Sequence, residues 1–293
     1  MASKPTPRYV LVTGGNRGVG YAVCKALMRA STALAPIAVI LMSRSKVSGK
    51  KALEQLASET PDAEVHAIEA DVRDAAWSSL PSLSRAIRDI VGDAPLHALV
   101  NNAGVALDLP WSPLVNGGDG EIATQTLETN ILGPVGLTRQ LQQVEIGRTE
   151  SLLRMGSRVI NISSGGGHIA IHKVKPDIRD SFLSSEFSTD DIVASALEFM
   201  NDARSGGKAR LEEKWGYSHI YGFSKLCMTM ATRTLARESN GLLVHACTPG
   251  FVLTDMTKGS SATTTPEQAA EIVVYLVLSE DEVVMSSGKF FNP

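Results

Sequence analysis

Tyr221 and Lys225 are a pair of residues whose types and spacing suggest acid–base chemistry. They stand four positions apart, so in a helix both side chains lie on one face with the ammonium near the phenol. A phenol with an ordinary pKa of about 10 is a poor acid–base catalyst near neutral pH, but a neighbouring Lys⁺ lowers that pKa. The pair is therefore a candidate proton donor. The alternative is an ordinary helix surface, because this spacing is common by chance.

Ser164 and two asparagines are candidates to work beside this pair. Ser164 follows an expected strand at its carboxyl end, where doubly wound sheets place ligand-binding residues, and its hydroxyl could polarise a carbonyl. Asn101 ends another expected strand in the same layer. Turn residues are the alternative for both positions. Asn130 lies in an expected helix over 127–137, an unfavourable place for Asn unless its side chain makes a specific hydrogen bond, functional or structural.

A glycine-rich segment between the first expected strand and the first expected helix is a candidate phosphate-binding loop. Its residues are Thr13-Gly14-Gly15-Asn16-Arg17-Gly18-Val19-Gly20. Glycines allow a pyrophosphate to approach the backbone closely, and the N-terminus of the following helix favours negative charge. A glycine cluster is a weak signal when it stands alone, but its place between strand and helix favours a nucleotide site.

The second expected strand ends in Ser43-Arg44, and the chain has no acidic residue between Gly20 and Glu54. An NAD enzyme of this fold normally places a carboxylate at the end of that strand, where it holds the adenosine ribose hydroxyls. Arg17 and Arg44 would instead suit a ribose 2′-phosphate, so NADP(H) is the predicted cofactor. The alternative is that these residues are solvated surface bases.

Short apolar runs alternate with amphipathic stretches, as in a parallel sheet with crossover helices. We expect a single α/β domain over 1–293, a Rossmann-type doubly wound sheet of about seven strands. The expected strands are 8–13, 37–43, 63–69, 96–101, 157–163, 242–247 and 287–291. A further helix should begin at Thr265-Pro266-Glu267-Gln268, which has the pattern of a capping box.

One segment, 166–216, breaks this alternation because it is richer in polar residues and has no convincing strand. We expect it to form short helices and loops on the domain surface, as an insertion before Tyr221.

Composition excludes several classes of function. The formal net charge is −3, and neither the three cysteines nor the six histidines have metal-ligand spacing, so no nucleic-acid partner and no metal site are expected. The N-terminal segment 1–8 has no apolar core of the signal-peptide kind, and the longest apolar run, 33–42, is too short to span a bilayer. A cytoplasmic protein with no membrane partner is the expectation.

Six ordered elements together resemble the short-chain dehydrogenase/reductase family: TGGNRGVG, NNAG, Asn130, NISS, YGFSK and CTPGFVLTDM. The resemblance implies that Tyr221 protonates the reduced carbonyl oxygen and that Lys225 lowers its pKa and holds the nicotinamide ribose. It also implies that Ser164 orients the substrate and that Asn130 positions a water in a proton relay.

The same resemblance implies a set of cofactor-binding residues spread over the chain. Besides Tyr221 and Lys225 they are Thr13, Gly14, Asn16, Arg17, Gly18, Val19, Gly20, Ser43, Arg44, Asp71, Val72, Asn101, Ala103, Gly104, Pro249, Gly250, Val252 and Thr254.

Within the family the chain is most similar to the carbonyl reductase branch. Tyr221 stands 57 positions after Ser164 (221 − 164), and that branch carries an insertion of this kind. The branch also has NNAGVA, the Trp215-Gly216 approach to YGFSK, and ACTPGFVLTDM. This similarity implies a monomer, because the insertion covers the surface that other members use for dimer packing. The sequence departs from the branch in detail within 166–216.

These observations predict NADPH-dependent reduction of a small-molecule carbonyl compound, an aldehyde, ketone or quinone. Two alternatives remain at this point: an NADPH-binding regulator without turnover, and an NADP-dependent alcohol dehydrogenase that works in the oxidative direction. Trp111, Trp215 and Tyr217 are the aromatic residues nearest in sequence to the expected cleft. They fit a pocket for flat hydrophobic substrates or simply packing, and His168 and His219 are further candidates to border the same cleft.

Overall fold

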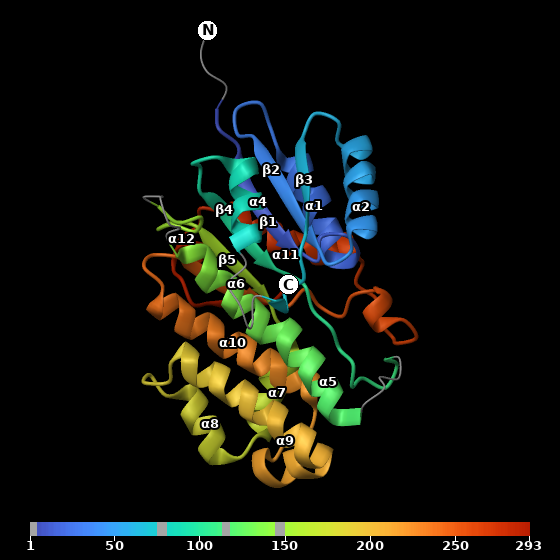
Figure 1. The fold of residues 1–293 in the computed structure, drawn as a ribbon, viewed down its shortest axis with the longest axis vertical. Helices are drawn as coiled ribbons and strands as arrows, with labels where there is room; N and C mark the ends of the chain where they lie inside the picture. Colours follow the sequence, from blue (N-terminus) through green and yellow to red (C-terminus); the bar gives the residue numbers. More distant parts are fainter. Residues whose placement is uncertain (1–4, 75–80, 113–117, 144–149) are drawn as a thin grey trace.

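The computed structural model describes residues 5–74, 81–112, 118–143 and 150–293 (Figure 1). Residues 1–4, which open the N-terminal segment discussed above, lie outside the described part of the chain. None of the described helices combines the length and apolar character that crossing a bilayer requires.

The centre of the molecule is a seven-stranded sheet in which every neighbouring pair of strands is parallel. Its order is β3-β2-β1-β4-β5-β6-β7, which confirms the expected doubly wound topology. The strands are β1 (Arg8–Thr13), β2 (Ile37–Ser43), β3 (Glu64–Glu69), β4 (Leu96–Asn101), β5 (Arg158–Ile162), β6 (Leu243–Cys247) and β7 (Phe290–Phe291). The chain reverses its direction of winding between β1 and β4, and ligands of such sheets bind in the crevice at that point.

The first six strands lie within one residue of their expected bounds, whereas β7 is shorter than expected. The prediction of 287–291 was too long because Gly288 has a φ of 86°, outside the extended region, so only Phe290 and Phe291 pair with β6.

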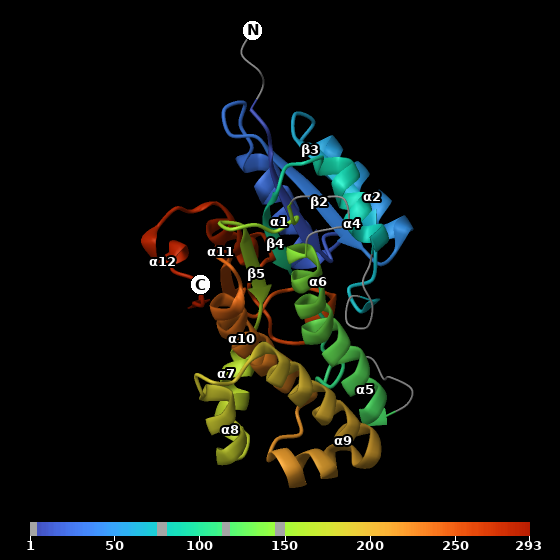
Figure 2. The ribbon, with the colours of Figure 1, turned by 60° about the vertical axis from the view of Figure 1, so that its left-hand side comes forward.

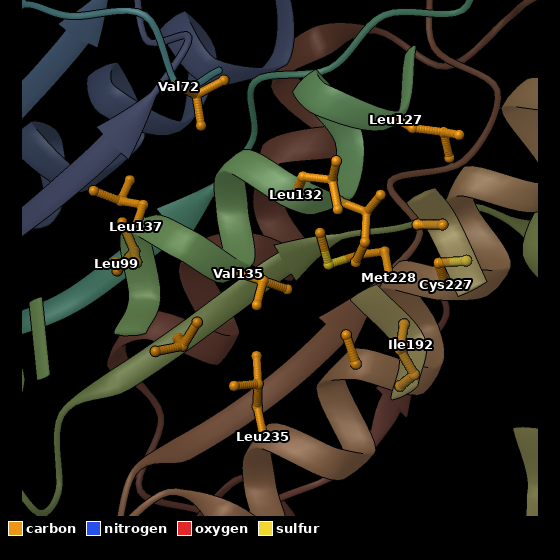
Figure 3. Close-up of a cluster of buried hydrophobic side chains, with 14 of the residues drawn as sticks. Val72, Leu99, Leu127, Leu132, Val135, Leu137, Ile192, Cys227, Met228 and Leu235 are labelled. Carbon is orange, nitrogen blue, oxygen red and sulfur yellow. The ribbon is translucent and has the colours of Figure 1, made fainter. Parts of the chain in front are cut away.

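Helices cover both faces of the sheet. Alternate residues of β1 show the two layers: Val10 and Val12 pack with residues of α1 and α11, while Leu11 belongs to the core on the opposite face. Figure 3 shows part of that second core, where Leu99 of β4 lies near Val135, Leu137 and other side chains of the covering helices. The helices that flank the sheet are α1 (Gly18–Ala30), α2 (Lys46–Glu59), α4 (Pro81–Val91), α5 (Gly118–Leu127), α6 (Gly133–Gln142), α10 (Ile220–Glu238), α11 (Pro266–Leu278) and α12 (Glu282–Met285).

The expected capping box is present at the start of α11. The backbone N–H of Gln268 donates to the Thr265 hydroxyl at 3.2 Å, and the Gln268 side chain accepts from the backbone N–H of Thr265 at 2.9 Å. Pro266 is the first helical residue, as the sequence predicted.

The segment 166–216 contains no strand, as expected, but its helices are not all short. It forms most of α7 (Gly165–Lys173), all of α8 (Pro176–Leu183) and α9 (Thr189–Trp215), which has 27 residues. The prediction was wrong for α9 because the chain continues through Gly207, at a φ of 57°, with only a kink. Asp119 stabilises the kink, since its carboxylate accepts from the Lys208 backbone N–H at 2.9 Å.

These helices gather at one end of the molecule, beside α5 and α10 (Figures 1 and 2). The rings of Phe199 in α9 and Phe223 in α10 stack with centroids 3.8 Å apart, and Trp215 lies edge-on to both. The insertion is therefore part of the main hydrophobic core and not a separate domain.

Candidate active site

A cavity of about 870 Å³ lies at the carboxyl ends of the strands, beside the point between β1 and β4 where the winding of the sheet reverses. This volume is at the upper end of the range typical of small-molecule sites, about 300–1,000 Å³. Residues that the sequence predicted for the site make up much of its wall: Gly14, Asn16, Arg17, Gly18, Val19, Gly20, Ser43, Arg44, Asp71, Val72, Ala103, Gly104, Ser164, Tyr221, Lys225, Pro249, Gly250, Val252 and Thr254. Thr13, Asn101 and Asn130 lie behind it.

The close-packed glycine positions of the loop leave no room for a side chain. A Cβ on Gly20 would lie 2.4 Å from both Asn102 Nδ2 and the Gly14 carbonyl oxygen. Gly14 and Gly18 have φ values of 64° and 55°, in the left-handed region that glycine adopts without strain. The loop leads into α1, whose N-cap residue Arg17 makes no side-chain capping bond, and whose first turn has no acidic residue. The first N–H groups of α1 are therefore suited to an anion at the cavity wall.

Thr13 joins this loop to the end of β4 from behind the cavity. Its hydroxyl accepts from the backbone N–H groups of Asn102 at 3.0 Å and Ala103 at 2.9 Å. The Asn102 side chain in turn donates to the Thr13 carbonyl at 2.8 Å. These bonds hold the carboxyl ends of β1 and β4 together at the reversal of the sheet.

The end of the cavity beside β2 carries basic and hydroxyl groups. Ser43, Arg44, Ser45 and Ser48 line it, without a carboxylate at the end of β2. The nearby Asp71 is ion-paired with Arg73, whose guanidinium lies 2.8 Å from the carboxylate. Burial would raise the pKa of Asp71, but the hydrogen bonds from Arg73 hold it below its ordinary value.

Arg17 lines the same cavity, and its guanidinium pairs with Asp255 at 2.9 Å. Asp255 belongs to a short 3₁₀ helix, Asp255–Thr257, in the segment that follows β6. Both side chains are largely exposed, at 66% and 76%.

Tyr221 and Lys225 lie on the first two turns of α10 and both line the cavity, as their spacing predicted. The Lys225 ammonium is 5.8 Å from the centre of the Tyr221 ring, and it donates to the Ile162 carbonyl at 2.8 Å. Burial lowers the pKa of Lys225 to about 8. Burial also raises the pKa of Tyr221, against the lowering that the sequence predicted, and the charge of Asp108 adds to this rise.

Ser164 approaches Tyr221 from the start of α7. Its hydroxyl accepts from the Gly166 backbone N–H at 3.1 Å and caps the helix. A Cβ on Gly166 would lie 3.5 Å from Ser164 Oγ and 3.8 Å from Tyr221 Cε1, so the two side chains are neighbours. Interaction with Ser164 opposes the effect of burial on the pKa of Tyr221. Both line the cavity, where one carbonyl oxygen could accept from the pair.

Asn130 lies in a π-helical turn, Glu128–Leu132, between α5 and α6. Its side chain accepts from the Val105 backbone N–H at 2.9 Å and donates to the Val105 carbonyl at 2.8 Å and to the Ser224 hydroxyl at 3.0 Å. The expected helix therefore contains a π-helical turn around Asn130. A Cβ on Gly104 would lie 3.3 Å from Asn130 Oδ1 and 3.7 Å from Lys225 Nζ, so both groups lie next to Gly104.

Asn101 faces the interior of the sheet and not the cavity. Its amide donates to the Asn161 side chain at 2.8 Å and to Thr138 at 3.3 Å. These contacts link the ends of β4 and β5 beneath the site.

The aromatic residues named from the sequence divide between cleft and core. Trp111 lines the cavity, with its ring centroid 5.9 Å from that of Phe251. Trp215 is buried in the insertion, where its indole donates to Asp202 at 2.9 Å. Tyr217 packs over Gly222 at the start of α10. The lining set does not include Trp215 or Tyr217.

The two histidines considered for the cleft do not line it either. The His168 ring packs against Phe290, with centroids 4.2 Å apart, and His219 is the N-cap of α10.

Several apolar residues of the site were not assigned to it from the sequence, although three of them stand within CTPGFVLTDM and Trp111 was named as near the expected cleft. An apolar rim faces the Tyr221 end of the cavity, formed by Leu109, Trp111, Phe251, Leu253 and Met256. Its parts come from the segment after β4 and the segment after β6, and the indole of Trp111 donates to the Met256 carbonyl at 3.0 Å. Only the folded chain brings these two segments together, so no local pattern predicts that they form one rim.

The fold and the arrangement of this cavity define the class of protein. The family model for short chain dehydrogenases matches residues 8–176. This match covers more than half of the chain, which therefore belongs to the short chain dehydrogenase family.

Individual relatives extend the similarity to nearly the full length. Carbonyl reductase (NADPH) 1 of Rattus norvegicus is 31% identical over 288 residues, which cover 96% of this chain and 94% of that protein. The protein of the same name from Homo sapiens is 31% identical over 290 residues, covering 96% and 95%. Among solved structures, salutaridine reductase of Papaver somniferum has a TM-score of 0.78 at 27% identity and covers 97% of this chain and 99% of its own. The expected resemblance to carbonyl reductases is confirmed.

Proposed function

We propose that this chain reduces carbonyl compounds, namely aldehydes, ketones or quinones, to alcohols with NADPH, and that Tyr221 is the proton donor. The carrying observation is that Ser164 and Tyr221 line the same cavity as neighbours, with Lys225 beside the phenol. The relatives named as NADPH carbonyl reductases support the same reaction.

The other end of the cavity fits the proposed cofactor. The N–H groups at the start of α1 and the close-packed glycines would hold the pyrophosphate, and a Cβ at Gly20 would collide with Asn102 and the Gly14 carbonyl and so displace the loop. Arg44 with Ser43 at the end of β2 would hold the ribose 2′-phosphate, since guanidinium groups bind phosphate strongly. When bound, NADPH supplies a hydride to the carbonyl carbon.

The residues of the chain then act on the carbonyl oxygen. Ser164 and Tyr221 would both donate hydrogen bonds to this oxygen, and the bonds would strengthen as negative charge develops on it. Tyr221 would transfer its proton to the oxygen and become a phenolate. The ammonium form of Lys225, 5.8 Å from the ring centre, would stabilise that phenolate. Lys225 would also hold the nicotinamide ribose.

Asn130 is proposed to support this proton transfer through a water, as in the family. In the structure its side chain also has a second task, because it clamps both polar groups of the Val105 peptide. The segment that carries the apolar rim therefore starts from a fixed point.

We further propose that the protein is a cytoplasmic monomer. The helix α9 packs along α5 and α10, and side chains from all three helices belong to one buried core. The insertion thereby covers helix surface that a second subunit would otherwise need.

The first experiment mixes the purified protein with NADPH and a panel of quinones, isatin, aromatic aldehydes and simple ketones. Loss of reduced-nicotinamide absorbance is followed, with NADH in parallel and Tyr221→Phe as the control. Turnover with NADPH that disappears in the variant supports the proposal. Binding of NADPH without reduction of any carbonyl or oxidation of any alcohol would favour the regulator, and faster oxidation of alcohols with NADP⁺ would favour the dehydrogenase.

A further inference from the structure

The first turn of α10, which carries Tyr221, is capped by two side chains. The Asp108 carboxylate accepts from the backbone N–H of Ile220 at 2.6 Å and from that of Tyr221 at 3.1 Å. The imidazole of His219 accepts from the Gly222 N–H at 3.1 Å. All three N–H groups that begin this helix therefore have side-chain acceptors, whereas those of α1 have none from the N-cap residue.

Asp108 is an unusual residue for this position because its side chain is only 1% exposed. A buried carboxylate is costly unless hydrogen bonds and positive charge compensate it. The N-terminus of α10 supplies both, through its N–H groups and its dipole. Asp108 lies in the segment after β4, 112 positions before Ile220, so the bond joins two distant parts of the chain.

The segment around Asp108 also forms the cavity wall. Val105, on one side, is clamped by Asn130, and Leu109 and Trp111, on the other, belong to the apolar rim. Asp108 thus connects the wall of the substrate end directly to the helix turn that carries the proton donor.

The charge of Asp108 acts on the phenols nearby. Burial is the main cause that raises the pKa of Tyr217 to about 12, and the charge of Asp108 adds to it. It raises the pKa of Tyr221 in the same direction. Neutralising Asp108 should therefore make Tyr221 easier to ionise.

We propose that Asp108 is a positioning residue for the reaction. It holds the first turn of α10, and with it the Tyr221 hydroxyl, at a fixed position relative to the apolar rim. This inference rests on the proposed function, since it assigns a task to the loop and helix that frame the same site. No sequence motif marks Asp108, and its task follows only from the contacts of the folded chain.

The test compares Asp108→Asn, which is nearly isosteric, with Asp191→Asn. Asp191 is a matched control because it also accepts a backbone N–H at a helix start, from Ser188 at 2.8 Å, but in the exposed first turn of α9. The kinetic parameters are measured for both from pH 6 to 10 on the carbonyl that the wild type reduces best. In parallel, the Tyr221 phenol is titrated by NMR of ¹³Cζ-tyrosine, with its signal assigned by its absence from Tyr221→Phe.

We expect Asp108→Asn to lower kcat about tenfold to a hundredfold with a smaller change in KM, because a misplaced donor costs rate more than binding. The alkaline limb of kcat and the NMR titration of Tyr221 should both move to lower pH. Asp191→Asn should change neither. If Asp108→Asn does not fold, Asp108→Ser is used, because its hydroxyl still accepts an N–H but carries no charge.

A kcat and a Tyr221 titration that match those of Asp191→Asn would overturn the proposal. The NMR result also separates it from the proposed function. If the wild type reduces no carbonyl, a lower Tyr221 pKa in Asp108→Asn still supports an action of the Asp108 carboxylate on the first turn of α10. An unchanged pKa overturns it.

Discussion

The two ends of the cavity are built in different ways. At the phosphate end, the loop proposed to hold the pyrophosphate is one continuous stretch, residues 13–20, and it presents mainly backbone N–H groups and glycines. The reaction end comes from side chains on separate segments, with Ser164 before α7, Tyr221 in α10 and Asp108 after β4. A substitution at the first end should therefore act by filling space, and one at the second by moving or removing a single polar group.

Tyr221→Phe is the sharpest way to test this difference, because it removes one oxygen from the reaction end and leaves the phosphate end intact. We expect kcat to fall about 10²–10⁴-fold, the usual contribution of a general acid, while the Kd for NADPH stays unchanged. Steady-state rates give the first value, and quenching of protein fluorescence by NADPH gives the second. A large loss of NADPH affinity would contradict the separation of the two ends.

Lys225 provides a test that needs no substrate. Its pKa in the folded chain is about 8, below the ordinary value of 10.5 in an unfolded chain. Between these values the unfolded chain binds a proton that the folded chain has lost, so stability should rise with pH across this window. The rise amounts to at most about 3 kcal/mol.

Urea unfolding from pH 7 to 10.5 measures this effect as the difference between the wild type and Lys225→Met. The variant lacks the titrating group, so its free energy of unfolding should not show the rise. Parallel curves for the two proteins would mean that Lys225 keeps an ordinary pKa in the folded state.

Gly20→Ala tests the phosphate end by adding one methyl group. Its Cβ would lie 2.4 Å from Asn102 Nδ2 and from the Gly14 carbonyl oxygen, and overpacking of this kind costs about 1–3 kcal/mol. We expect the Kd for NADPH to rise about tenfold to a hundredfold, with kcat near the wild-type value at saturating cofactor.

The matched control is Gly165→Ala, because a Cβ there would meet no atom within 4 Å. It should leave the Kd for NADPH unchanged. Equal effects of the two alanines would show that close packing of the backbone does not set cofactor affinity.

Asp255→Asn should have the smallest effect. It releases Arg17 from an exposed ion pair, and pairs of this kind contribute about 0–1 kcal/mol. We expect NADPH to bind less than about fivefold more tightly at low salt, with the difference lost at 1 M salt, where charges are screened within about 3 Å. Asp180→Asn, which breaks the exposed pair with Arg179, serves as the control and should leave binding unchanged.

The sequence predicted what depends on local patterns. The strand bounds, the capping box at Thr265, the glycine-rich loop and the Tyr221–Lys225 pair all follow from short-range spacing, and the structure places them as expected. The fold and the family are confirmed. The roles of the individual site residues and the preference for NADP(H) remain predictions, which the relatives support.

What the sequence did not predict depends on contacts between distant segments. Asp108 and Ile220 are 112 positions apart, and nothing near Asp108 shows that a helix start will cover it. The position of Trp215 was ambiguous because the neighbouring sequence does not distinguish an indole that lines a cleft from one that is buried in a core. In the structure its contacts with Asp202 and Phe199 place it in the core. The length of α9 was missed because Gly207 usually ends a helix, and only the bond from Lys208 to Asp119 shows why the chain continues.

The stacking of Phe199 on Phe223 also bears on the order in which the chain folds. Residues 8–162 include the glycine-rich loop and the strands β1 to β5, so the phosphate end can form before α10 leaves the ribosome. Ser164 and Tyr221 can meet only after the chain between them has closed a long loop and α9 has docked on α10. During synthesis, the reaction end of the cavity should therefore be completed later than the glycine-rich loop, since it needs α9 and α10 in place.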